Sequence, residues 1–217
     1  MAYTGCTGIN GIRSATTHMN KRTIMAGLIA SLLGLIGCGK TTPKADRADI
    51  YRDLRQQVLT LDPKSIGLAE NSSNHVWGVL METRYPEGVA TLVTIADGTV
   101  SLYFSNGGGV IGVGQHDGPR RACAEFISAA PTFVPFANAV TTFPLPALGN
   151  TRFYFLTFDG IRSVEVKEDD LGNNRHDLSP FFHVGHKVIT QANLVDEKMR
   201  AEQGAAPTAA GASSVER

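Results

Sequence analysis

Three histidines, His176, His183 and His186, lie close together near the end of the chain, beside several aspartates. Neutral imidazoles together with a carboxylate are a ligand set that zinc prefers. If residues 179–200 are helical, His183 and His186 lie about 60° apart on one face, opposite the apolar stripe that contains Phe181. They could then share a metal ion, with His176 in the preceding loop, as in a metal-dependent hydrolase. The alternative is a solvated helix face that holds no metal.

A glycine-rich turn, Gly107-Gly108-Gly109, precedes an expected helix start that carries Arg120 and Arg121. Glycines let backbone N–H groups approach a ligand, and a helix N-terminus favours anions. These residues are therefore a candidate phosphate or carboxylate site. Asp117 stands where the last glycine of a dinucleotide-binding motif would be, so that motif is not completed. A turn that needs positive φ is the alternative interpretation.

A third candidate lies between Met19 and Cys38. A short basic stretch, Met19 to Arg22, is followed by fifteen uncharged residues, Thr23 to Gly37. That run is shorter than the roughly 20 residues that a membrane-spanning helix needs, and it suits the apolar core of a secretory signal peptide. The alternative is a buried helix of a cytosolic domain.

The four residues Leu35-Ile36-Gly37-Cys38 resemble the lipobox of bacterial lipoproteins. The resemblance implies cleavage before Cys38, lipid attachment to the Cys38 thiol and acylation of the new amino terminus. The protein would then be anchored through membrane lipid at the bacterial cell envelope. In a bacterium with two membranes, Gly39 in place of an aspartate implies transfer to the periplasmic side of the outer membrane.

Residues 34–41, GLIGCGKT, also match the P-loop pattern, with Lys40 as the phosphate-binding lysine. A P-loop lies between a buried strand and a helix in a parallel sheet. Pro43 falls in the first turn of the required helix, and Asp97 is followed by Gly98 in an expected hairpin. A cytosolic nucleotide-binding protein is therefore kept only as a minor alternative.

Composition narrows the function classes. The 217 residues contain twenty basic and twenty acidic side chains, a balance that argues against nucleic-acid binding through a broad basic field. Hydrophobic residues make up 42%, enough for a packed core. Three cysteines exclude a disulfide framework, and Cys123 is expected to be a small buried residue on an apolar helix face. No motif calls for a cofactor.

Hydrophobic spacing predicts the elements that position these residues. We expect the order helix, three strands, helix, two strands, helix, over residues 46–61, 76–81, 89–96, 99–105, 117–130, 152–158, 161–167 and 179–200. Asp97-Gly98 and Asp159-Gly160 are typical of hairpin turns. The stripe Ile50, Leu54, Val58 and Leu61 is expected to face the core. The aromatic residues expected in the strand core are Trp77, Phe104, Phe153, Tyr154, Phe155 and Phe158.

This order predicts an α+β fold, a five-stranded antiparallel sheet with packed helices. At the level of topology it resembles the longin and roadblock group of profilin-like folds, which implies a binding or dimerisation module. The stretch from Trp77 to Gly112 also resembles bacterial proteins, a likeness that implies no activity.

The expected organisation is an extension at 1–18, a signal peptide at 19–37, a lipidated cysteine and tether at 38–45, one globular domain at 46–200, and a disordered tail at 201–217. The leading hypothesis is an envelope lipoprotein with a non-catalytic domain that binds a protein or small molecule, or a second copy of itself. An envelope enzyme that uses the three histidines is the alternative.

Overall fold

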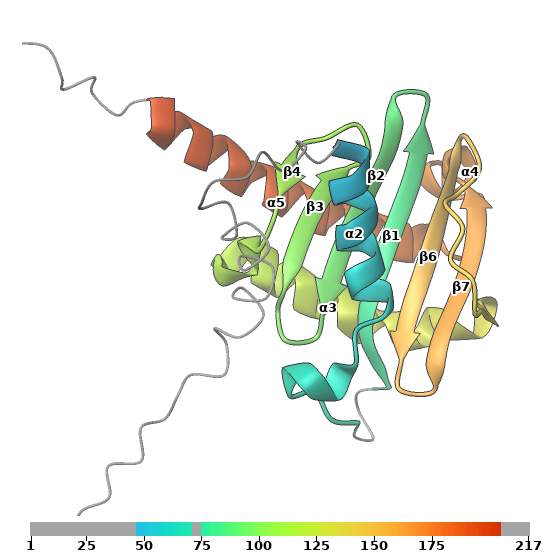
Figure 1. Ribbon diagram of the computed structural model, residues 1–217. Coiled ribbons are helices and arrows are strands. Elements are labelled where there is room, and N and C mark those ends of the chain that lie inside the picture. The colour runs from blue at the N-terminus through green and yellow to red at the C-terminus, as the bar shows by residue number, and fades with distance from the viewer. Residues whose placement is uncertain (1–46, 71–74, 205–217) are drawn as a thin grey trace, which may run out of the picture.

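The computed structural model describes residues 47–70 and 75–204. Within them, seven strands form one antiparallel sheet in the order β4-β3-β2-β1-β6-β7-β5 (Figure 1). The strands are β1 (Val76–Tyr85), β2 (Gly88–Ile95), β3 (Val100–Phe104), β4 (Gly109–Val110), β5 (Asn138–Ala139), β6 (Asn150–Thr157) and β7 (Gly160–Lys167). The prediction of an α+β fold with an antiparallel sheet and packed helices is confirmed.

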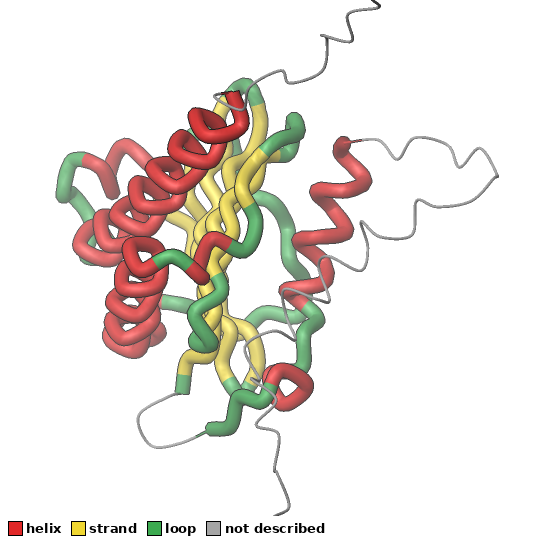
Figure 2. Tube along the Cα trace, turned by 90° about the vertical axis from the view of Figure 1, so that its left-hand side faces the viewer, coloured by secondary structure: helices red, strands yellow, loops and turns green. Residues whose placement is uncertain are grey.

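Helices cover both faces of the sheet. α3 (Asp117–Phe133) and α5 (Ser179–Gly204) lie on one face, and α2 (Arg47–Leu59) lies on the other (Figure 2). Shorter helical segments connect these elements: η2 (Pro63–Ile66), η3 (Val113–Gln115), η4 (Val134–Phe136) and α4 (Glu168–Gly172). The larger apolar cluster lies under α3 and α5, and a second cluster lies under α2.

The expectation of five strands is wrong for the described part of the chain, which has seven. The additional strands β4 and β5 each contain two residues and lie at opposite edges of the sheet. β4 begins at Gly109, the last residue of the glycine turn, and β5 lies between the predicted elements 117–130 and 152–158, where the sequence predicted no strand. A two-residue ladder is too short for alternation of apolar and polar residues to reveal it.

Both Asp-Gly pairs lie at hairpin turns, as the sequence predicts. Gly98 joins β2 to β3 with φ +93°, and Gly160 lies at the β6–β7 turn with φ +122°. The Asp97 carboxylate accepts a hydrogen bond from the N–H of Thr99 at 2.8 Å. This local bond and the positive φ that glycine tolerates explain why these positions reverse the chain.

The stripe predicted for the first helix is rotated in the structure. Ile50 is 49% exposed, and the side chains that face the sheet are those of Tyr51, Arg55, Val58 and Leu59. The prediction is wrong for Ile50 but holds for Val58, which is buried, and in part for Leu54 and Leu61, which pack partly buried against the apolar cluster under α2. Arg55 faces inward because it is buried against an acidic partner on the sheet, which removes the usual reason for an arginine to face solvent.

The other helices follow their predicted positions with small differences. α3 continues through Pro131 to Phe133, and its N-cap is His116. α5 reaches Gly204, beyond the expected end at 200. Gly185 lets α5 approach β1 closely, because a Cβ there would lie 2.7 Å from Met81 Sδ. None of the described helices is both long and apolar enough to cross a membrane.

The aromatic core is largely as expected. Trp77, Phe153, Tyr154 and Phe155 are buried. Phe158 is only partly buried, and Phe104 is 37% exposed at the end of β3. The prediction that Phe104 belongs to the core is wrong: Phe104 is the last residue of β3 and lies beyond the two residues of β3 that pair with β4.

Candidate ligand-binding groove

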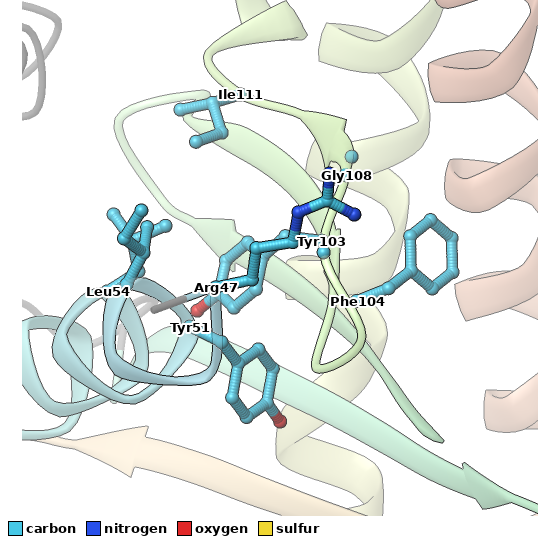
Figure 3. Close-up of a pocket in the computed structure, with 10 residues that line it drawn as sticks. Arg47, Tyr51, Leu54, Tyr103, Phe104, Gly108 and Ile111 are labelled. Atoms are coloured by element: carbon cyan, nitrogen blue, oxygen red, sulfur yellow. The ribbon is translucent and has the colours of Figure 1, made fainter. Parts of the chain in front are cut away.

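A groove lies between the first half of α2 and the β3–β4 hairpin (Figure 3). Its volume is about 200 Å³. α2 contributes Arg47, Ile50, Tyr51 and Leu54, and the hairpin region contributes Tyr103, Phe104, Gly107, Gly108, Gly109 and Ile111. Except for Arg47 and the tyrosine hydroxyls, the side chains around this space are apolar.

Arg47 lies across the glycine turn. A Cβ at Gly107 would be 2.6 Å from Arg47 Cδ and 3.4 Å from its Nε. Figure 3 shows the guanidinium beside Gly108 at the rim of the groove. Gly107 and Gly108 both have positive φ, +100° and +86°. Glycine at 107 therefore serves two needs, the backbone conformation and the space that the arginine stem occupies.

Tyr103 forms part of the groove wall and is only 5% exposed. Its hydroxyl is buried and has no hydrogen-bond partner among residues 47–70 and 75–204. In Figure 3 the ring passes behind Arg47 and its hydroxyl points toward α2. Burial, followed by the negative charge of Glu82, raises the pKa of Tyr103 well above its usual value. The hydroxyl is therefore a neutral donor without an acceptor, which is costly in a folded protein.

The neighbouring Tyr51 differs in this respect. Its ring meets that of Tyr103 edge-on, with centroids 5.7 Å apart, and its hydroxyl lies 2.9 Å from Thr91 Oγ1. Thr91 in turn donates to Glu82 Oε1 at 3.2 Å, so Tyr51 is the donor to Thr91. Burial and the charge of Glu82 raise the pKa of Tyr51 to about 12. Of the two tyrosines, only Tyr103 has a hydroxyl without a hydrogen-bond partner in the described part of the chain.

Strand register places Tyr103 at the end of a polar row that crosses the sheet beneath α2. Tyr103 pairs with Thr91, Thr91 with Glu82, Glu82 with Arg152, and Arg152 with Glu165. The row spans five strands, from β3 to β7. On the other side of Tyr103, the next partner is Gly109 of the glycine turn. The groove therefore lies where the row meets the β4 edge of the sheet.

Arg55 of α2 holds the helix onto this row. Its Nε and Nη2 donate to Glu82 Oε1 and Oε2 at 2.7 and 2.9 Å, and the Glu82 side chain is fully buried. The guanidinium also lies over the Tyr154 ring, 5.5 Å from its centroid. Tyr154 donates to the carbonyl of Pro144 in the segment that covers this face. The bidentate pair fixes the helix that forms one wall of the groove.

The predicted anion site is not assembled as expected. Arg120 Nε donates to the carbonyl of Gly114 at 2.9 Å, and its stem lies near Gly98 at the β2–β3 turn. That turn is at the opposite end of β3 from Gly107–Gly109. Arg121 is exposed on α3. The cation that the structure brings to the glycine turn is Arg47, which the sequence analysis did not single out.

The rings of His183 and His186 both lie against Phe182, but His176 and His183 have different hydrogen-bond partners. His183 Nε2 lies 3.0 Å from Asn174 Oδ1, and His176 Nδ1 accepts the N–H of Leu178 at 3.1 Å. The His186 ring packs 4.3 Å from that of Phe182, and burial, with a smaller contribution from His183, lowers its pKa. The described residues contain no group of three His, Cys, Asp or Glu side chains able to hold a metal ion.

Cys123 is buried, as predicted. Its Sγ donates to the carbonyl of Ile95 at 3.4 Å. Burial, with a smaller contribution from the charge of Asp97, raises the pKa of the thiol to about 12, which leaves it protonated and unreactive at neutral pH.

The lipobox cysteine Cys38 and the P-loop lysine Lys40 lie outside the described residues. Within those residues every strand pair is antiparallel, whereas a P-loop sheet is parallel. No family model, no curated protein and no solved structure matches the chain. The groove and the sequence around Cys38 are therefore the features that bear on function.

Sequence reasoning missed both polar side chains that distinguish the groove. Arg47 and the glycine turn are sixty positions apart, and no spacing rule links them. Tyr103 lies within the expected strand 99–105 and was not singled out. The available signal was the pair of arginines at 47 and 55 on one helix, spaced two turns apart around Tyr51.

Proposed function

We propose that this chain is a lipid-anchored protein of the bacterial cell envelope whose α+β domain binds a ligand in the α2–β3–β4 groove and performs no catalysis. The observation that carries the proposal is the Tyr103 hydroxyl, which is buried in the wall of an apolar groove and has no hydrogen-bond partner among the described residues. A bound acceptor would satisfy that hydroxyl, and pockets that combine apolar walls with a few polar groups are typical ligand sites.

The anchor in this proposal is Cys38, through the lipobox resemblance. Arg47, at the rim of the groove, follows Cys38 by nine residues, a distance of at most about 30 Å in extended chain. The groove would therefore stay close to the membrane surface. A protein with more than one acyl chain is held firmly, whereas one chain binds only marginally. In a bacterium with two membranes, Gly39 favours the periplasmic side of the outer membrane.

The likeness to longin and roadblock proteins remains part of this proposal. The likeness rests on an antiparallel sheet with packed helices and on the chain order of three strands, a helix, two strands and a helix among the longer elements. Members of the longin and roadblock group serve mostly in binding or dimerisation, which agrees with a non-catalytic role for this chain. A fold alone does not determine function, so the proposed binding role rests on the groove.

Intact mass and cell fractionation of the full-length product test the anchor. We expect a membrane-bound species that begins at Cys38 and is heavier by its acyl chains. Cys38→Ala should leave the chain unprocessed, and the matched control Cys6→Ala should be processed normally, because Cys6 precedes the cleavage site. A wild-type chain that stays unprocessed and outside the membrane fraction would overturn the proposed localisation.

A further inference from the structure

The groove is small and has one charged side chain at its rim. Its volume of about 200 Å³ is below the roughly 300–1,000 Å³ of sites that enclose a whole drug-sized ligand. A ligand of this site would therefore place only one part of itself in the groove and leave the rest outside. A molecule that is itself embedded in a membrane meets that description.

The residues that line the groove indicate which chemical groups the inserted part of the ligand carries. Ile50, Leu54 and Ile111 offer apolar contact, and Ile50 and Ile111 are 49% and 40% exposed at the rim. Exposed aliphatic side chains beside an arginine suit the boundary between lipid headgroups and acyl chains. Arg47 stands over the glycine turn, where an anionic group could receive charge-assisted hydrogen bonds from its guanidinium.

The Tyr103 hydroxyl adds a second requirement. It needs an acceptor inside an otherwise apolar space, because it is buried and unpartnered among the described residues. An ester carbonyl is such an acceptor: it is uncharged, and in a phospholipid it lies between the phosphate and the acyl chain. A plain hydrocarbon would leave the hydroxyl unsatisfied, and a fully charged soluble anion would leave the apolar wall without a partner.

We propose that the α2–β3–β4 groove binds an anionic phospholipid of the membrane to which the protein is tethered. The phosphate lies at Arg47 above the glycine turn, an ester carbonyl accepts from the Tyr103 hydroxyl, and the start of one acyl chain lies between Ile50 and Ile111. The domain would then rest on the membrane with its α2–β4 edge. This inference depends on the proposed function through the anchor at Cys38.

Photocrosslinking of the full-length, membrane-reconstituted chain tests the inference. A photoreactive benzoylphenylalanine replaces Ile111 in one variant and Phe136 in the other. Both positions are exposed, at 40% and 44%, but Phe136 lies in η4, which leads into β5 at the opposite edge of the sheet. The vesicles contain either phosphatidylcholine alone or equal parts of phosphatidylcholine and phosphatidylglycerol. Lipid adducts are identified by mass.

We expect phosphatidylglycerol adducts at position 111, about tenfold above those at 136 and preferred over phosphatidylcholine by a similar factor. Arg47→Gln should abolish the preference for phosphatidylglycerol. Arg52→Gln, on the same helix with a 70% exposed side chain, should retain it. Equal adducts at the two positions, no adduct at 111, or a preference that survives Arg47→Gln would overturn the inference.

The two proposals fail in different ways. A chain that is processed and acylated at Cys38 but gives no lipid adduct at position 111 removes the lipid site and leaves the anchored binding protein standing. A chain that is never processed at Cys38 removes the proposed anchor, whatever adducts it forms. The mass of the purified protein, measured before irradiation, separates these results.

Discussion

Arg55 of α2 and Glu82 of β1 form a bidentate ion pair beneath the helix, with nitrogen–oxygen distances of 2.7 and 2.9 Å. Glu82 is completely buried, and the side chain of Arg55 is 10% exposed. A buried pair of this kind adds little net stability over apolar residues, but removing one partner leaves an uncompensated charge. The pair therefore makes the position of α2, and of the groove beside it, sensitive to single substitutions.

Arg55→Met should destabilise the domain by about 3–5 kcal/mol, because it leaves the Glu82 carboxylate buried without its cation. Urea unfolding followed by the fluorescence of Trp77, the only tryptophan in the chain, measures the change. Arg52→Met is the matched control: its ion pair with Asp49 is exposed, so the loss should stay within about 0.5 kcal/mol. Equal losses in the two variants would contradict the assigned role of Arg55.

Tyr103→Phe should leave the unligated domain as stable as the wild type, or up to about 1–3 kcal/mol more stable, because it removes a buried hydroxyl for which the described residues provide no partner. Tyr51→Phe should cost about 1 kcal/mol, because it breaks the hydrogen bond to Thr91. Lipid adducts at position 111 should fall in Tyr103→Phe alone. The same urea titration and the crosslinking assay compare the two. A Tyr103→Phe variant that loses more stability than Tyr51→Phe would show that the Tyr103 hydroxyl has a structural partner.

Gly107→Ala and Gly108→Ala separate backbone strain from the position of Arg47. Each places a side chain at positive φ, which costs about 1–2 kcal/mol. Only Gly107→Ala also meets Arg47, since a Cβ at Gly108 has no atom within 4 Å. We therefore expect similar unfolding free energies and a loss of the phosphatidylglycerol preference in Gly107→Ala alone. If both variants keep that preference, the position of Arg47 over the glycine turn is not required for the preference for phosphatidylglycerol.

Cys123 should resist alkylation in the folded protein up to about pH 9 and react readily after unfolding in urea. Its folded pKa of about 12 lies above the unfolded value of 9.0, so the protonated thiol favours the folded state. That contribution is complete below pH 9 and is lost as the pH rises toward 12. Peptide mass mapping after brief iodoacetamide treatment at a series of pH values checks this. Rapid modification at pH 8 in the folded chain would contradict the burial.

The order of the main helices and strands could be read from the sequence. Strand alternation, the two Asp-Gly turns and the apolar spacing of α3 and α5 are local signals, and they depend on residues within a few positions of one another. The buried state of Cys123 followed from its place in such a stripe. The lipobox around Cys38 is likewise a short contiguous pattern, and it stays a prediction.

The groove could not be read in this way. The row from Tyr103 through Thr91 and Glu82 to Arg152 and Glu165 joins residues from five strands, and its members share no sequence spacing. Residues that the sequence groups into one candidate site, such as His176 with His183 or Gly109 with Arg120, have different surroundings in the structure.

Local patterning by itself determined which segments become helices and strands, because each such segment hides its apolar face with a fixed period. Tertiary structure decided which face α2 presents to the sheet and which cation reaches the glycine turn. Arg55 faces inward because Glu82, twenty-seven residues away, neutralises it there. The same orientation of α2 places Arg47 over Gly107, where the absence of a Cβ leaves room for the aliphatic part of the arginine side chain.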